Sequence, residues 1–367
     1  MEVLKKKGRI GRIFLFLCAG LLFYKPLNLL AVDFERMQKE IDGYLAGKKF
    51  NFEKTYIIKI GTLAPERTPW TDIPRNYIIP KILDVSNGKV KVVLYSSGVM
   101  GDDPDVVRKV RLGQLQGCGC TATGLYILAP ELSVFSLPFM FSDYEEVNYV
   151  LDKLSPEIDA ILKKRNLFPF AIIHTGFMFL FSKEMINSLN TMRKNKVLTW
   201  FGKIEQETLK TLGINPIPLS VPEVVMGLRS GLITAHFSPP VWSLSAQAYL
   251  STPFSMEPPF FYAPAGVIVD ANSIKDIPSE AISLTRDVMK IGERYWAEAV
   301  VEYEQKAISA FKEMGIKFVR MEEGDIKEVK KKSEELWWRL AEEGLYPRDF
   351  LEKVIRAKEE FKLKIKR

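Results

Sequence analysis

The alternation of hydrophobic and polar positions along the chain predicts an α/β protein, and it is clearest in residues 213–240. There Ser220 and Glu223 form the two ends of a capping box, in which a hydroxyl and a carboxylate each accept a backbone N–H at the start of a helix. Gly231 ends this helix, and the apolar residues 232–237 follow as a buried strand. Because open α/β sheets bind ligands beyond the carboxyl ends of their strands, the next loop is a candidate binding site.

The same order of elements occurs earlier in the chain. Asp103 is placed to cap a helix that Gly113 ends, and residues 115–120 form a short strand of small and apolar residues. Further strands are predicted at Tyr56–Ile60 and Lys89–Tyr95. Two equivalent helix–glycine–strand units predict two similar lobes that face each other across a central cleft.

Three longer segments are predicted to join the lobes. Phe168–Gly176 and Ala265–Asp270 are buried segments that we expect to cross between the lobes as hinge strands. Ser279–Met314 follows one amphipathic helical pattern, which at ~1.5 Å per residue is roughly 50 Å long. A helix of that length exceeds one small lobe, so we expect it to span both.

The first 31 residues differ in kind from the rest. Five basic residues between Lys5 and Arg12 precede an apolar run, Ile13–Tyr24, which is the plan of a secretory signal peptide. The run is short for a membrane span, so a periplasmic location is expected, with a retained anchor as the alternative. Residues 1–31 hold six of the 52 basic and one of the 45 acidic residues, which leaves 46 against 44 and indicates no nucleic-acid partner.

The motifs of common catalytic sites are absent from the sequence. It has no Gly-x-Ser-x-Gly elbow, no phosphate-binding Gly-Lys-Ser/Thr loop, no His-Glu-x-x-His and no dinucleotide Gly-x-Gly-x-x-Gly. The two histidines, His174 and His236, fall in apolar strands, where we interpret them as core residues; a neutral hydrogen-bonding role in a cleft is the alternative. We therefore expect no enzymatic activity, no cofactor and no metal.

Cys118 and Cys120 are the two cysteines outside the first 31 residues. We interpret them as two small buried strand residues, because so small a disulfide ring strains the geometry; a disulfide is the alternative. The sequence offers no further ligands at a spacing that would make them a metal site.

Five segments follow one another in the order found in a known family. They are Gly101–Gly113, Phe135–Phe141, Leu212–Pro218, Glu223–Gly231 and the long helix. With them the chain resembles the substrate-binding proteins of TRAP transporters, the DctP/TakP-like family, over most of residues 55–320. The resemblance implies a two-lobed periplasmic-binding-protein fold that closes on a small organic solute and delivers it to the membrane permease subunits of a TRAP-type secondary transporter.

The resemblance and the element pattern together give the expected organisation of the chain. The predicted units are a signal peptide (1–31), an N-terminal helical extension (32–54), lobe 1 (55–172, with part of 266–320), lobe 2 (173–265), the lobe-spanning helix (279–314) and C-terminal helices (322–367).

Two departures from the family pattern bear on the ligand. Family members commonly hold an organic anion through an arginine in a Lys-(Ile/Met)-Arg-(Val/Thr)-Pro strand, and Leu198 stands in that position. The family segment Gly-Val-Val-Asp-Gly-Gln-Glu-Asn-Pro reads Gly-Leu-Ile-Thr-Ala-His-Phe-Ser-Pro from Gly231 to Pro239. Because a buried carboxylate needs a partner such as a bidentate arginine, tight binding of dicarboxylates or sialic-acid-like ligands is not expected. Arg67 or Arg229 is the alternative source of positive charge.

These departures predict a cleft with apolar and aromatic walls and a modest polar end near His236 and Thr123, suited to a larger and more hydrophobic ligand. Phe139 and Phe141 follow Leu137-Pro138, an extended pair that we expect to expose them from a loop. The predicted ligand-binding residues are Trp70, Thr123, Phe139, Phe141, Phe177, Leu198, Trp200, His236 and Phe237.

Two other functions stay open at this point. The same fold can carry a hydrophobic or lipid-like ligand to a tetratricopeptide-repeat periplasmic partner, and such a carrier would not need adjacent permease genes. An exported enzyme that reused the fold would show turnover that disappears with His236→Ala.

Overall fold

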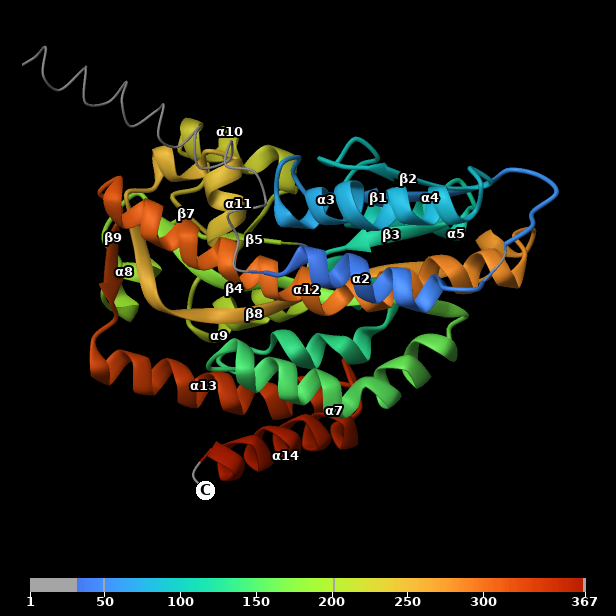
Figure 1. The fold of residues 1–367 in the computed structure, drawn as a ribbon. Helices are drawn as coiled ribbons and strands as arrows, with labels where there is room; N and C mark the ends of the chain where they lie inside the picture. The colour runs from blue at the N-terminus through green and yellow to red at the C-terminus, as the bar shows by residue number, and fades with distance from the viewer. Residues whose placement is uncertain (1–31, 49, 201, 366–367) are drawn as a thin grey trace, which may run out of the picture.

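The computed structural model describes residues 32–48, 50–200 and 202–365. The predicted signal peptide, residues 1–31, lies outside the described residues. In the described part of the chain, no helix combines the length and the apolar character that crossing a membrane requires. The fold is α/β, with helices on both sides of a central sheet (Figure 1).

One sheet runs through the molecule. Within the described residues it has seven strands in the order β2-β1-β3-β8-β4-β7, with β9 beside β8. β1 pairs in parallel with β2 and β3, whereas β8 is antiparallel to β3 and β4. β5 (Leu198–Thr199) and β6 (Ile217–Pro218) form a separate parallel pair. The strands of the main sheet are β1 (Tyr56–Thr62), β2 (Val90–Tyr95), β3 (Gly117–Cys120), β4 (Leu167–Ser182), β7 (Ala235–Ser238), β8 (Phe254–Asp270) and β9 (Lys317–Arg320).

β4 and β8 join the two lobes as a long antiparallel pair. At one end β8 pairs with β3, and at the other end β4 pairs with β7. Both predicted hinge strands are therefore present, but each is longer than the sequence indicated, because its apolar pattern continues into the other lobe. The pairing register of β4 against β8 shifts at three places, one of them between His174 and Gly176.

Short helices follow the strands at the β1–β3 side of the sheet. α5 begins after Asp102, whose carboxylate accepts a hydrogen bond from the Asp103 backbone N–H at 2.8 Å. The N-cap is therefore Asp102, and the expectation of Asp103 was wrong by one residue, because Asp103 turns inward and is buried. The elements of this region are α3 (Pro69–Ile73), η2 (Pro74–Ile78), α4 (Ile79–Val85), α5 (Asp103–Arg111), α6 (Ala122–Leu128), η3 (Pro130–Ser136) and α7 (Tyr144–Lys163).

The second lobe contains the capping box expected from the sequence. Ser220 N donates to Glu223 Oε2 at 2.9 Å, and Gly231 ends the helix at a φ of 76°. The strand after it is shorter than predicted and begins at Ala235. Pro240 starts a new helix, because a proline in the first helical turn lacks only a donor that would be unused. The elements are α8 (Leu189–Arg193), α9 (Lys203–Thr211), η4 (Val221–Glu223), α10 (Val224–Ser230), α11 (Pro240–Ser245) and η5 (Ala248–Ser251). η6 (Asn272–Ile274) follows β8 at its other end, in the first lobe, where it contacts α5.

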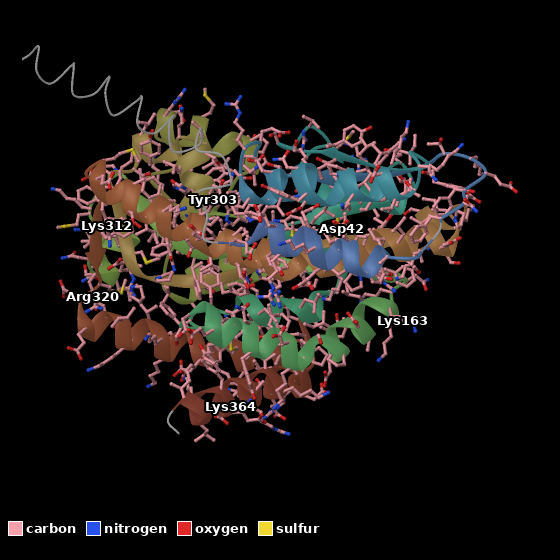
Figure 2. All side chains as sticks on the ribbon, viewed as in Figure 1. Asp42, Lys163, Tyr303, Lys312, Arg320 and Lys364 are labelled. Atoms are coloured by element: carbon pink, nitrogen blue, oxygen red, sulfur yellow. A yellow bond between two sulfur atoms is a disulfide. The ribbon has the colours of Figure 1, made fainter. Side chains whose placement is uncertain are left out.

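α12 (Ser279–Glu313) is the long helix that the sequence predicted. It packs on β4, contacts α3 in one lobe and α11 in the other, and runs along the length of the molecule (Figure 1). Its 35 residues correspond to about 52 Å. The remaining helices are α2 (Phe34–Leu45), α13 (Glu323–Glu342) and α14 (Arg348–Ile365), and α14 packs on α7. Figure 2 shows Lys163 and Lys364 at the outer ends of α7 and α14, where both are exposed.

Cys118 and Cys120 form a disulfide within β3. The interpretation as two unpaired residues was wrong. Residues two apart on a strand point to the same face of the sheet, and the two Cα atoms lie 5.2 Å apart, within the range that a disulfide spans.

Candidate ligand-binding site

A cavity lies where the two lobes meet. Its lining comes from β1, β3 and their following loops on one side and from α9, η4 and α11 on the other; β4, β8 and α12 contribute from both lobes. The space open to the centres of water-sized molecules is about 130 Å³, whereas one bound water needs roughly 10–15 Å³ on that measure. The cavity therefore has room for a small organic molecule.

The walls of the cavity are mainly apolar and aromatic. Four of the six tryptophans of the chain line it: Trp70, Trp200, Trp242 and Trp296. The Trp70 indole N–H donates to the carbonyl of His174 at 3.0 Å, which fixes this ring in the wall. Trp200 and Trp242 meet edge to face with ring centroids 6.2 Å apart. Walls of this kind favour a ligand with an apolar or aromatic body.

Several polar groups of the lining are already bonded within the protein. Thr62 Oγ1 donates to the carbonyl of Gly119 at 2.7 Å. Asp103 accepts hydrogen bonds from the backbone N–H and the hydroxyl of Thr121. Burial nevertheless raises the pKa of the Asp103 carboxyl to about 6. These groups hold the loops of the first lobe in place and leave little bonding capacity for a ligand.

Three buried polar atoms of the lining have no hydrogen-bond partner among the described residues. They are Trp200 Nε1, Glu205 Oε2 and Trp296 Nε1. Glu205 lies in the first turn of α9 and is only 7% exposed. Burial raises the pKa of its carboxyl to about 7. Because buried polar atoms are normally paired, two unpaired donors and one unpaired acceptor around one cavity make it a candidate ligand-binding site.

Comparison with known proteins shows which family the chain belongs to. Residues 61–343 match the bacterial extracellular solute-binding proteins, family 7 (DctP). The chain belongs to this family. The matched range includes both lobes and the lining elements named above, apart from the first residue of the cavity wall, Ile60.

Several relatives in the family have named ligands. The 2,3-diketo-L-gulonate-binding periplasmic protein YiaO of Escherichia coli is 24% identical over 242 residues, which cover 64% of this chain and 72% of that protein. The C4-dicarboxylate-binding periplasmic protein DctP of Rhodobacter capsulatus is 21% identical over 235 residues, which cover 63% and 70%.

Solved structures of family members share the fold. The sugar acid binding protein DctPAm of Advenella mimigardefordensis, in complex with galactonate, has a TM-score of 0.77 at 18% identity and covers 84% of this chain and 99% of its own. A TRAP periplasmic solute binding protein of Haemophilus influenzae with bound L-gulonate has the same TM-score and identity and covers 82% and 99%. The predicted two-lobed fold and the resemblance to TRAP solute-binding proteins are confirmed. Nothing in these comparisons supports a tetratricopeptide-repeat partner.

The cavity of this family 7 protein contains three of the nine predicted ligand-binding residues: Trp70, Thr123 and Trp200. The other six lie outside its lining and pack into the core around it. These six are Phe139, Phe141, Phe177, Leu198, His236 and Phe237.

The phenylalanines among these six pack against other aromatic side chains of the core. Phe141 and Phe177 each pack against Tyr262, with ring centroids 5.7 Å apart in both pairs. Phe139 packs on Phe260 at 4.7 Å. The expectation that a loop exposes Phe141 was therefore wrong, because an aromatic side chain of β8 packs against its ring, whereas Phe139 is half-buried. Phe141 is 7% exposed.

His236 lies one layer behind the cavity. It is fully buried, stacks on Phe181 and meets Trp242, which does line the cavity, edge to face at 6.1 Å. Burial lowers the pKa of His236 to about 3, so the ring is neutral at physiological pH. Both of its ring nitrogens lack a hydrogen-bond partner among the described residues.

The described lining supplies no basic side chain in place of the arginine that the family resemblance led us to expect at position 198. Among the lining residues that the structure describes there is no lysine, arginine or histidine. Arg67 and Arg229, the two alternatives raised by the sequence, are exposed and do not belong to the lining. Leu198 itself is fully buried with Val224 and Leu228 of α10.

Sequence reasoning missed Glu205, Trp242 and Trp296. A signal for Glu205 exists: residues 205, 208, 209 and 212 share one face of α9, and that face is otherwise buried. An acid on an apolar helix face is a candidate functional residue. Trp296 had no comparable signal, because a tryptophan on the buried face of a long helix is most often a packing residue.

Proposed function

We propose that this protein is the extracytoplasmic receptor of a TRAP-type transporter, which captures an organic ligand between its lobes in the periplasm and delivers it to membrane permease subunits, without catalysis. Membership in family 7 and the likeness to TRAP solute-binding proteins support this function. The cavity between the lobes is the site that it requires.

The ligand that fits this cavity has an apolar body and no free carboxylate. Sugar acids occupy the two solved structures named above. In this chain the lining offers no basic side chain, at least among the described residues, and contains the carboxyls of Asp102, Asp103 and Glu205. A ligand carboxylate would lose its hydration without gaining a cation and would face like charges, which is costly. The absence of a basic partner in an aromatic cavity is the observation that carries the proposed ligand class.

Extraction of the native ligand tests the proposal. The protein is purified from the periplasm without added ligand, examined by native mass spectrometry and then extracted with solvent. We expect one co-purified organic molecule without a carboxylate. Ala64→Trp, which places a large ring in the cavity wall, should abolish its retention. Val99→Trp adds the same ring at a position that is 69% exposed and outside the lining, and should leave retention intact.

Two results would contradict the proposal. If galactonate or L-gulonate raises the melting temperature of protein that carries no co-purified molecule, the ligand is an acid. If Ala64→Trp folds and still retains the native molecule, the ligand binds elsewhere. Uptake of the identified molecule by cells with and without the receptor and its permease then tests delivery.

A further inference from the structure

Glu205 differs from the other acids of the cavity. Asp102 Oδ2 accepts a hydrogen bond from Val221 N at 3.0 Å, and Asp103 is bonded to Thr121. Glu205 Oε2 has no partner among the described residues. A β-carbon at Gly202 would collide with this oxygen, so the carboxyl occupies space that only a glycine at the start of α9 leaves open. The carboxyl therefore packs against the start of α9 at Gly202, and Glu205 contributes to the cavity lining from there.

The residues around Glu205 favour a positively charged ligand group as its partner. The described lining contains acids and indoles but no basic side chain, so no cation of that lining pairs with an ionised Glu205. A neutral donor on a ligand would pair one oxygen and leave the charge uncompensated. A ligand nitrogen that carries a positive charge would supply both the hydrogen bond and the charge.

The tryptophans of the cavity suit the same ligand. Aromatic rings attract cations through their quadrupole, and tryptophan does so most strongly. Trp200, Trp242 and Trp296 line the cavity together with Glu205. The unpaired indole N–H groups of Trp200 and Trp296 are donors, so they fit an acceptor atom on the same ligand.

We infer that the ligand carries an ammonium nitrogen on an apolar body, and that Glu205 is the residue that recognises this nitrogen within the tryptophan-lined cavity. This inference rests on the proposed function, since it takes the cavity as the ligand site. Beyond the proposed function, the inference states that the ligand is positively charged and names Glu205 as the residue that recognises this charge.

Four probes of similar size test the inference: phenethylamine, benzyltrimethylammonium, 2-phenylethanol and 3-phenylpropanoate. Their binding to the full chain is measured by thermal shift and calorimetry after exhaustive dialysis. We expect the two cations to raise the melting temperature at millimolar concentration, the alcohol to do so less, and the carboxylate not at all. Glu205→Gln should weaken phenethylamine binding roughly 10- to 100-fold, because the ammonium loses its anionic partner and keeps at most a hydrogen bond to a neutral amide oxygen.

Glu207→Gln is the matched control, two residues away on α9. Glu207 pairs with Lys210 and Arg339 outside the cavity, so its replacement should leave probe binding unchanged. The inference is overturned if the carboxylate binds more tightly than the amine, if Glu205→Gln binds phenethylamine as wild type does, or if neither cation binds.

The outcomes also separate this inference from the proposed function. One outcome is that 2-phenylethanol binds wild type and Glu205→Gln equally, and that neither cation binds more tightly than this alcohol. The cavity would then be a site for an apolar ligand, and the ammonium assignment would be wrong. If Ala64→Trp retains the native molecule, the cavity itself is wrong, whatever the charge of the ligand. Trp296→Phe, which removes one unpaired N–H and keeps a ring, is a second variant and should weaken phenethylamine binding less than Glu205→Gln does.

Discussion

Asp102 Oδ2 accepts a hydrogen bond from the backbone N–H of Val221 at 3.0 Å, although the two residues are 119 positions apart in the chain. The other carboxylate oxygen, Oδ1, accepts the N–H of Asp103 at the start of α5. Both Asp102 and Val221 line the cavity, one from each lobe. One carboxylate therefore caps a helix of the first lobe and at the same time holds the first turn of the helical segment of the second lobe.

Asp102→Asn should open the lobes without uncapping α5. Asparagine is as good an N-cap as aspartate, but its amide nitrogen cannot accept from Val221 N. The lost bond is partly exposed, so we expect a cost of about 1 kcal/mol, which shifts the balance of closed and open states several-fold. Spin labels at Leu112→Cys and Leu232→Cys, both exposed, would report longer and broader distances in Asp102→Asn. An unchanged distance distribution would show that this bond does not hold the lobes.

Glu304 is a buried acid beneath the crossing strands. It lies on α12, is 5% exposed, and accepts a hydrogen bond from Phe177 N at 3.2 Å. Tyr144 is a second hydrogen-bond partner. Burial raises the pKa of Glu304 from 4.5 to about 8, so the carboxyl keeps its proton in the folded protein at neutral pH.

Stability should therefore fall as pH rises from 4.5, the pKa of Glu304 in the unfolded chain, to about 8, its pKa in the folded protein. In this window the unfolded chain has released the proton that the folded chain still binds, and each pH unit costs up to about 1.4 kcal/mol of unfolding free energy. Glu304→Gln lacks this dependence, so its stability relative to wild type should rise from pH 5 to pH 8 in urea unfolding. Glu298→Gln, an exposed residue of the same helix, should show a constant difference. Parallel curves for wild type and Glu304→Gln would disprove the shift.

Gly176 occupies a position where any side chain should be destabilising. Its φ is 129°, and a β-carbon there would approach Glu304 Oε2 to 2.6 Å. We expect Gly176→Ala to lower the unfolding free energy by about 2 kcal/mol or more. Gly43→Ala lies within α2 with no atom within 4 Å of the new carbon, and should instead raise it by up to about 1 kcal/mol. Denaturant unfolding of both variants measures the two changes in unfolding free energy. Equal changes would show that the conformation and close packing of Gly176 do not exclude a side chain.

The parts of the fold that follow from local chemistry could be predicted from the sequence. The capping box of Ser220 and Glu223 and the helix end at Gly231 depend only on neighbouring residues. The long apolar segments that form β4, β8 and α12 likewise indicate elements that join two lobes. The cap of α5 was placed one residue late, because Asp102 and Asp103 are equivalent until the fold shows which one is buried.

The site could be predicted only in part, because the wall of a cavity is decided by packing between distant segments. Trp200 lines the cavity, whereas Phe237 is covered by Phe260 and Phe261 of β8, and nothing in the local sequence separates the two cases. Leu198, in the position where the resemblance implies an arginine, directed attention to the charge of the cavity. Glu205, the acid of the lining with an unpaired oxygen, belongs to no motif, and its one signal in the sequence is its place on an apolar helix face.

The charge of Glu205 should make cation binding depend on pH. Benzyltrimethylammonium is permanently charged, so any pH dependence of its affinity comes from the protein. Burial raises the pKa of Glu205 to about 7, and a bound cation favours the ionised form, so affinity should rise about tenfold per pH unit below this pKa and level off above it.

The groups that face Glu205 define the controls for this last measurement. Tyr126 interacts with it electrostatically, and burial keeps the pKa of that phenol well above its usual range, so Tyr126 stays neutral throughout. Of the acids that share the lining, Asp102 is held by Val221 N and Asp103 has a pKa raised by burial to about 6. Calorimetric titrations from pH 5.5 to 8.5 should therefore give a steep rise for wild type and a shallow one, centred nearer pH 6, for Glu205→Gln. Affinity that falls as pH rises would mean that protonated Glu205 donates to an acceptor on the ligand, and the ammonium assignment would be wrong.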